Sequence, residues 1–206
     1  MERTTVAAGS LAAVRDVLRS GEVSLGPDAD VVVVPTAAAF TGVTPATLAV
    51  AEALDDWGAR IEGVMVGDRA AADEAYFARR VGEADVVVLT DGSPLHARAV
   101  WRDTATGAAI ERSRVVVAVG AVASVLGAVM IDPRGGAPTT GLGYRTGLVV
   151  TVPAPLDQLA RTRALLGADV TLAVVGPAGA VVNRGGAWRV ALADVVVTRG
   201  SRVVEL

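Results

Sequence analysis

The stretch Arg114–Gly136, RVVVAVGAVASVLGAVMIDPRGG, decides the fold, and the rest of the chain is arranged around it. Its segment Val115–Val119 is an uninterrupted, valine-rich apolar run, which is typical of a strand buried on both faces of a parallel sheet. Gly120 breaks this run, and Ala121–Met130 is small and apolar enough to predict a helix packed under the sheet. Many α/β enzymes present a nucleophile on such a strand, turn and helix. Here the turn, Val119–Val122, contains no Ser, Cys, Thr or Asp, so the chemistry is missing where the architecture expects it.

The composition limits the chemistry that this chain can perform. The chain has 206 residues, a net charge of −3 and 52% hydrophobic residues, and these values predict a single α/β domain over residues 1–206 with a large core. All 19 basic residues are Arg, so there is no Walker A or Schiff-base lysine. The absence of Cys and the single His96 exclude disulfides, thiolate nucleophiles and multi-histidine metal sites. We therefore expect no metal and no cofactor, and the lack of a basic stripe disfavours nucleic-acid binding.

Two uncharged stretches, Val31–Ala51 and Val115–Ile131, are the candidates for membrane spans. The first contains Pro35 and Pro45, and the second has only 17 residues and is interrupted by glycine. Both fit buried strands with their helices better. The N-terminal sequence MERTTVAAGSLAAVR has no convincing apolar core of a signal peptide. We therefore expect a soluble, cytoplasmic protein without a membrane segment.

Apolar runs and turn residues alternate along the chain in the order strand, helix, strand. Strands are predicted at Thr5–Ala8, Asp30–Val34, Arg60–Val66, Asp85–Thr90, Val115–Val119, Leu148–Val152 and Val170–Val175. Helices are predicted at Leu11–Leu18, at 44–57 with Thr44 as N-cap and Pro45 at the first position, and at Ala70–Val81, Leu95–Trp101, Ala105–Arg112 and Leu156–Leu166. The tail from Val181 onward has short runs that indicate antiparallel strands at a sheet edge. The alternation predicts a doubly wound, mostly parallel sheet.

In such a sheet, ligands bind beyond the carboxyl ends of the strands. The segments that arrive there are Pro35–Gly42, Asp91–His96 and Gly120–Val122. We expect these three loops to meet at one site.

Three sequence motifs in these regions resemble those of a known family. VVVVPTAAAF, DVVVLTDGSPLHARAV and MIDPRGGAPTTGLG are together similar to actinobacterial members of the cyanophycinase and dipeptidase E group of serine peptidases. The similarity covers roughly residues 30 to 152 and implies a class I glutamine amidotransferase-like fold. In active members the central strand ends in Gly-(Ser/Thr)-Ser-Ala-Gly-Ala, and the second of these hydroxyl positions is the nucleophile.

Aligning that motif on this chain puts the nucleophile position at Gly120 or at Val122, and neither residue can attack a carbonyl. The family's catalytic His follows the strand after the Gly-Leu-Gly loop, where this chain reads VVTVPAP at 149–155. Since a serine needs its base and the base needs its serine, the loss of both argues against the family's reaction. The resemblance therefore implies the fold together with a degenerate catalytic motif, as in a pseudoenzyme.

Three side chains remain as catalytic candidates. Ser124 lies four residues past Gly120, and it is either a displaced nucleophile or a helix serine bonded to a backbone carbonyl. Ser93 precedes Pro94 and fits an N-cap. His96 is either a residue that contacts a ligand or an ordinary surface or capping residue; the resemblance gives it no role as a base.

Ligand contacts are expected at Thr36, Gly92, Ser93, His96, Ala121 and Arg134. The resemblance implies that backbone N–H groups at Gly92 and Ala121 form an oxyanion hole. Asp91 stands where the family usually has Gly, and its carboxylate would repel the charge that such a hole stabilises. Arg134 could bind a carboxylate or phosphate through its fork, or form an ion pair with Asp132.

The leading hypothesis is a catalytically degenerate, peptidase-like protein that acts as a binding or partner subunit. It would form a homodimer, or a heteromer with an intact homologue, because the family forms dimers and a mean hydropathy of +0.49 provides apolar surface to spare. One alternative is an active serine hydrolase with a rearranged site that uses Ser93 or Ser124 with His96. Another is a sensor for a small peptide or metabolite.

Overall fold

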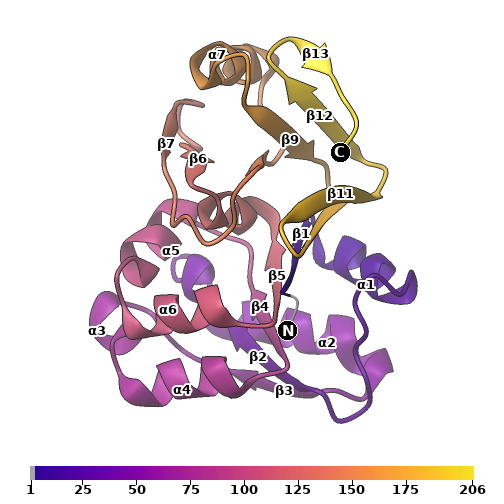
Figure 1. Cartoon of the computed structure of the whole chain (residues 1–206). Coiled ribbons are helices and arrows are strands. Elements are labelled where there is room, and N and C mark those ends of the chain that lie inside the picture. The colour runs from indigo at the N-terminus through magenta and orange to yellow at the C-terminus, as the bar shows by residue number, and fades with distance from the viewer. Residues whose placement is uncertain (1–2) are drawn as a thin grey trace.

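The fold is centred on a seven-stranded sheet, seen in a computed structural model that describes residues 3–206 (Figure 1). The strand order is β11-β10-β1-β5-β4-β2-β3. The strands are β1 Thr4–Ala8, β2 Asp30–Val34, β3 Arg60–Gly63, β4 Val86–Leu89, β5 Val115–Val119, β10 Ala180–Arg184 and β11 Ala187–Leu192. The five strands β1 to β5 are parallel, and the β10–β11 hairpin extends the sheet antiparallel to β1. This confirms the α/β class and the mostly parallel central sheet.

Helices cover both faces of this sheet (Figure 1). They are α1 Leu11–Arg19, α2 Val43–Leu54, α3 Arg69–Ala72, α4 Ala75–Glu83, α5 Pro94–Trp101 and α6 Ala105–Arg112. The valines of β2 alternate between the two layers: Val31 and Val33 belong to the core that also contains α1 and α2, and Val32 and Val34 belong to the core with α4, α5 and α6. Because the period of a strand is two, an all-valine strand fills both cores at once.

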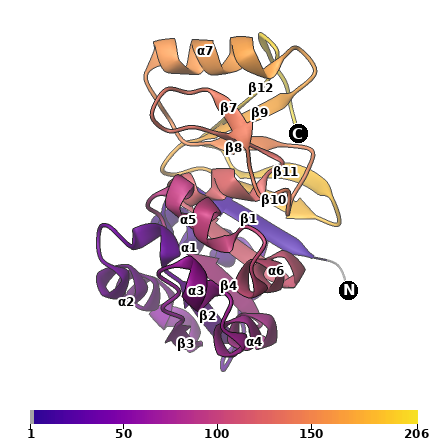
Figure 2. The ribbon, with the colours of Figure 1, turned by 90° about the vertical axis from the view of Figure 1, so that its left-hand side faces the viewer.

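The remaining strands leave the main sheet and lie above the carboxyl ends of its parallel strands (Figure 2). A two-stranded sheet pairs β6 Val129–Ile131 with β7 Pro138–Thr140. A second sheet, here named the C-terminal sheet, has the order β13-β12-β9-β8. Its strands are β8 Val149–Thr151, β9 Thr171–Val175, β12 Val195–Arg199 and β13 Arg202–Val203, and helix α7 Leu156–Leu166 packs beside it. Of the antiparallel strands expected near the C-terminus, β10 and β11 lie at the edge of the main sheet, whereas β12 and β13 lie in the C-terminal sheet with β8 and β9.

The helix predicted over Ala121–Met130 was also wrong. The chain instead forms a 3-10 segment, η3 Gly120–Leu126, and Gly127 then adopts an extended backbone that leads into β6. The residues of β6, Val129–Ile131, pair with Thr140, Thr139 and Pro138 of β7. Two of the three residues of β6 are β-branched, so a strand partner provided by tertiary structure outweighs the weak helix propensity of this segment.

Two other helix predictions needed adjustment. The predicted helix at 70–81 is split into α3 and α4, because Glu74 between them has an extended backbone (ψ 127°). The Asp73 carboxylate at the break accepts a hydrogen bond from Ala105 N at the start of α6 (3.0 Å). Helix α2 begins at Val43 after Gly42, whose φ is +118°, so Thr44 is not its N-cap. Pro45 then occupies the third helical position, where a missing N–H costs nothing because the first turn of a helix leaves its N–H groups free.

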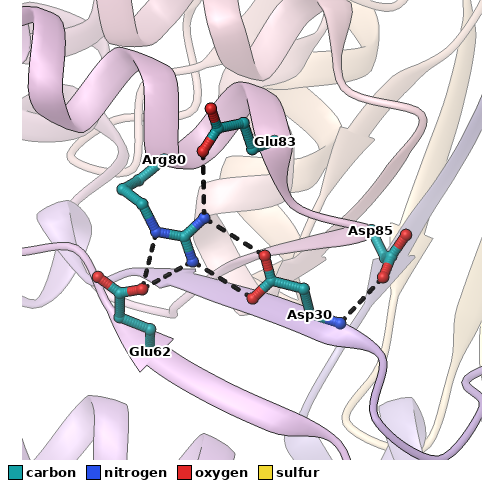
Figure 3. Close-up of polar contacts among 5 residues, drawn as sticks. All are labelled: Asp30, Glu62, Arg80, Glu83 and Asp85. Carbon is teal, nitrogen blue, oxygen red and sulfur yellow. Dashed lines mark hydrogen bonds and ion pairs between the residues drawn. The ribbon is translucent and has the colours of Figure 1, made fainter.

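The amino end of the sheet is fastened to α4 by one arginine (Figure 3). Arg80 donates to Glu62 Oε2 from Nε (2.8 Å) and from a terminal nitrogen (2.7 Å), and to both oxygens of Asp30 at 3.3 Å. Glu83 completes the group at 3.9 Å. The hydrogen bonds to Glu62 and Asp30 raise the pKa of Arg80, so the guanidinium is a permanent cation that joins α4 to β2 and β3.

No helix within residues 3–206 has the length and apolar character that a membrane crossing requires. The two uncharged stretches form β2 with α2 and β5 with η3 and β6.

Candidate functional site

The three loops expected at the carboxyl ends of the parallel strands meet in the structure. The loop after β2 contacts the loop after β4 through Ser93 N, which donates to Ala37 O (2.7 Å). The loop after β4 contacts the turn after β5 through Asp91, whose carboxylate accepts from Ala121 N (2.9 Å). These contacts bring residues 36–42, 91–96 and 120–122 to one edge, and we name this region the elbow site.

The carboxylate of Asp91 occupies the centre of the elbow site. Its Oδ1 accepts hydrogen bonds from Gly92 N (2.8 Å) and from Ala121 N (2.9 Å). These are the two N–H groups that the sequence resemblance implies for an oxyanion hole. Two N–H groups that converge on one oxygen form a site for negative charge, and here the protein supplies that charge itself.

Gly120 leaves the room that this carboxylate fills. Its φ is +64°, in the left-handed region that favours glycine. A Cβ built on Gly120 would stand 2.5 Å or less from Cγ and both oxygens of Asp91. A side chain at position 120 and the observed position of Asp91 therefore exclude each other. The other candidate for the nucleophile position, Val122, has a fully buried side chain in the main core.

Gly92 is required by a close approach of two loops. Its φ is +145°, and a Cβ there would overlap the carbonyl group of Ala37. Because a backbone carbonyl cannot move aside as a flexible side chain can, only glycine fits. The close approach holds the N–H of Gly92 in its place at the elbow site.

Both candidate serines use their hydroxyls to stabilise local backbone. Ser93 is the N-cap of α5, as the sequence predicts, and its Oγ accepts from His96 N (3.2 Å). Ser124 Oγ donates to Ala121 O (2.8 Å) within η3. The Ser124 bond is the backbone-capping alternative that the sequence left open for this residue.

The His96 ring points away from these hydroxyls. Its Nε2 lies 3.0 Å from Gly67 O, and since a carbonyl can only accept, Nε2 carries the proton in this arrangement. The ring packs edge-on against Phe40, with 4.9 Å between the ring centroids. Within the described residues, the His96 ring makes no hydrogen bond to a serine or threonine hydroxyl.

Thr36 and Arg134 do not face the elbow site. The Thr36 hydroxyl is buried, where it donates to Val66 O (2.7 Å) and accepts from Trp101 Nε1 (3.1 Å). The Arg134 guanidinium forms an ion pair with Asp132 through two hydrogen bonds, from Nε to Oδ1 (3.0 Å) and from a terminal nitrogen to Oδ2 (2.7 Å). These side-chain bonds lower the pKa of Asp132. The structure thus forms the Asp132 ion pair that the sequence left open for Arg134.

A small cavity of about 180 Å³ adjoins the elbow site. Ala121 and Ser124 line one side of it, and the segment 151–155, TVPAP, lines another. This is the region in which the resemblance places the family's catalytic His, and it offers the cavity no group that could take up a proton near neutral pH. Within residues 3–206, no cluster of three or more His, Cys, Asp or Glu side chains could hold a metal ion.

Comparisons with known proteins support the fold. No family model matches the sequence, and no curated protein matches it. Among solved structures, a peptidase from an acI-B1 Actinobacterium matches with a TM-score of 0.75 and 18% identity, over 100% of this chain and 94% of that one. A peptidase E-type protein from Listeria monocytogenes EGD-e matches with a TM-score of 0.65 and 15% identity, over 97% of this chain and 99% of that one. The chain therefore has a peptidase E-like α/β fold over its whole length.

Proposed function

We propose that this protein is a catalytically inactive relative of peptidase E-type serine peptidases that acts as a binding or partner subunit. The observation that carries the proposal is the Asp91 carboxylate on the N–H groups of Gly92 and Ala121. An oxyanion hole works because its donors are free to stabilise charge that develops in the transition state. A carboxylate already bound there both occupies the donors and repels a second negative charge.

The positions of the potential catalytic groups also support an inactive protein. Position 120 has no side chain, and the hydroxyls of Ser93 and Ser124 are engaged with backbone atoms. Nucleophilic catalysis needs a hydroxyl within hydrogen-bond reach of a base, and the His96 ring bonds to Gly67 O instead. An active hydrolase that uses Ser93 or Ser124 with His96 would require the His96 ring and the serine hydroxyl in use to reorient.

The test is a hydrolysis assay with aspartyl dipeptides and with cyanophycin-like polymers, together with labelling by a fluorophosphonate. We expect neither turnover nor labelling of the purified protein, while an active serine peptidase assayed in parallel responds to both. Turnover that is lost in Ser93→Ala or Ser124→Ala protein would overturn the proposal and establish the rearranged hydrolase.

For the partner, we propose a second copy of this chain, docked at a groove beside α7. This α7 groove has a volume of about 680 Å³ and lies between α7 and the strands β12 and β13. Leu172 and Val174 of β9 belong to the small core that contains Leu159 of α7. Their neighbours on β12, Thr198 and Val196, line the groove instead, so the helix covers only part of this sheet face.

The apolar character of the groove favours a protein partner. Val196 is 48% exposed and Val203 is 76% exposed, and both line the groove together with Ala160 and Ala164 of α7. β13 is an edge strand of the C-terminal sheet, and an uncovered apolar edge is the kind of surface that pairs with another chain. A peptide or metabolite sensor is the second candidate function, favoured by the cavity of about 180 Å³ beside Ala121. Ligand-dependent melting would identify it.

A further inference from the structure

A buried arginine at the other end of the main sheet has no carboxylate partner. Arg145 is only 7% exposed. Its Nε donates to Thr5 Oγ1, and one terminal nitrogen donates to Glu111 O (3.2 Å) and Tyr144 O (2.7 Å). The second terminal nitrogen is buried and has no hydrogen-bond partner within residues 3–206.

Buried charges in proteins are normally paired, because an ion that loses its water is unstable without an opposite charge. Arg145 has only neutral acceptors and forms no ion pair in the described part of the chain. Burial and the positive charge of Arg3 lower the pKa of Arg145. The negative charge of the Glu111 side chain raises this pKa, but Arg145 bonds only to the backbone carbonyl of Glu111 and not to its carboxylate. The guanidinium therefore lies in an environment that an added anion would stabilise.

Arg145 is one of the residues that line a cavity of about 340 Å³. Arg3 directly precedes β1, and its carbonyl oxygen accepts from Gly185 N (3.3 Å) in the β10–β11 hairpin, whose turn Gly185–Gly186 forms one wall of the cavity. Trp188 Nε1 donates to Thr146 O (2.8 Å) and so fixes the opposite wall to the hairpin. The lining contains two arginines and no acidic residue.

Asn183 adds a buried amide to the same cavity. It is 5% exposed and pairs with Thr5 across β10 and β1, so it lies on the face of the sheet that Arg145 contacts. Its Oδ1 accepts from Gly186 N (3.2 Å). An amide side chain has two further donor hydrogens on its nitrogen. The cavity thus combines two guanidinium groups with a buried amide.

We propose that this Arg3–Arg145 pocket binds the oxyanion group, a carboxylate or a phosphate, of a small polar ligand. The exposed guanidinium of Arg3 would donate to its oxygens, since a guanidinium matches either group in geometry and charge, and the buried charge of Arg145 in the same lining would stabilise the anion. The pocket precedes Thr4 of β1, whereas the elbow site follows Val119 of the parallel neighbour β5. The two sites therefore lie at opposite ends of the sheet, and this proposal is independent of the proposed function.

The test measures thermal unfolding of the full chain against sodium phosphate, sodium succinate and sodium chloride at matched ionic strength. We expect a saturable rise of about 5 °C or more for phosphate, succinate or both, at about a hundred times Kd. The anion that acts at lower concentration identifies the ligand group. An equal response to chloride would mean general screening by salt and would overturn the proposal.

Arg3→Gln is the decisive variant because Arg3 is exposed and its loss should leave the fold intact. We expect its Kd for the active anion, measured by calorimetry, to rise at least about tenfold. Arg202→Gln removes an exposed arginine from β13 and should bind like the unchanged protein. Equal affinity in all three proteins would show that the anion binds without Arg3, outside this pocket, and would overturn the proposal.

Asn183→Asp provides a second test that does not depend on ligand affinity. The aspartate can still accept from Gly186 N, and it adds a carboxylate to the lining that contains both arginines. We expect a higher melting temperature without ligand and no further rise with phosphate or succinate. A lower melting temperature, or an undiminished further rise with phosphate or succinate, would overturn the proposal.

Discussion

At the residue scale, the position of the Asp91 carboxylate depends on the absence of a side chain at Gly120. The carboxylate of Asp91 is held by Gly92 N and Ala121 N in the space that a side chain at 120 would need. A change at either position alters the environment of the other. Loss of the nucleophile and occupation of the N–H pair are therefore one coupled feature of this chain.

This coupling predicts the effect of Gly120→Ser. The serine must adopt a left-handed backbone, at about 1–2 kcal/mol, and it displaces Asp91 from two hydrogen bonds of about 0.5–1.5 kcal/mol each. We expect the free energy of unfolding, measured with urea, to fall by about 2–5 kcal/mol. We expect no gain of peptidase activity, because residues 149–155 still contain no His.

Asp91→Gly is the matched control. In that background only the backbone strain remains, so Gly120→Ser should cost about 1–2 kcal/mol. The difference between the two backgrounds is the coupling energy of the pair. If Gly120→Ser costs the same in both, the carboxylate does not occupy the space at position 120 in solution.

The sequence allowed only part of the elbow site to be predicted. The pattern of strands and glycines located the loops that contain Asp91, Gly92 and Gly120. The sequence also showed that a carboxylate at position 91 conflicts with an oxyanion hole, because it would repel the negative charge. The bond from Asp91 to Ala121 N could not be foreseen, because it joins residues 30 positions apart through a side-chain conformation set by the fold. The lone arginine in the loop at Tyr144–Thr146 gave no signal that it would be buried without an acid.

At the scale of elements, burial on both faces made the strands predictable and left some helices uncertain. The sequences of β2 and β5 are valine-rich runs that are typical of buried strands. The structure confirms both predicted strands. The segment after Gly120 is equally apolar, and its pattern could not distinguish a helix from the observed 3-10 segment and strand. Its outcome depends on pairing with β7, a contact that the apolar pattern of residues 121–130 does not contain.

Arg80 shows how one helix is held to the sheet, and it supports a prediction at this scale. Its side chain is 17% exposed and bonds to carboxylates from β2 and β3 (Figure 3). Arg80→Gln leaves Asp30 and Glu62 without their cation. We expect a loss of about 2 kcal/mol, between the values for exposed and for buried ion pairs. Hydrogen exchange should show the largest loss of protection in α4.

Arg79→Gln is the control for this experiment. Arg79 is the preceding residue of α4, its side chain is 64% exposed, and its only ion pair in the described residues is to Glu83 at 4.0 Å. We expect it to cost less than about 1 kcal/mol even with its contact to the Tyr76 ring. Similar losses in both variants would mean that the charge of α4 matters and the Arg80 network does not.

At the scale of the whole molecule, the chain builds a small second layer on the carboxyl ends of a conventional α/β sheet. The sequence indicated the short strands of this layer but not their partners, because β8 and β9 are runs that would fit equally well in the main sheet. Their pairing is fixed by β12, which returns antiparallel to β9 after the β10–β11 hairpin. The α7 groove is a consequence of this topology, since α7 packs against β9 and leaves Val196 of β12 48% exposed.

The uncovered face of the C-terminal sheet leads us to expect a dimer. If a second copy fills the α7 groove, the protein should sediment as a dimer at micromolar concentration, because a stable interface buries about 1,200–2,000 Å² of surface in total. Val203→Asp puts a charge on the exposed edge of the groove, and we expect it to shift the protein to monomer by raising the dimer Kd at least about a hundredfold. Leu48→Asp, at an exposed position of α2, should leave the dimer unchanged. A monomeric unchanged protein would remove the second copy as partner, and the cavity of about 180 Å³ beside Ala121 would then make ligand sensing the better account of a fold that has kept its architecture without its catalytic groups.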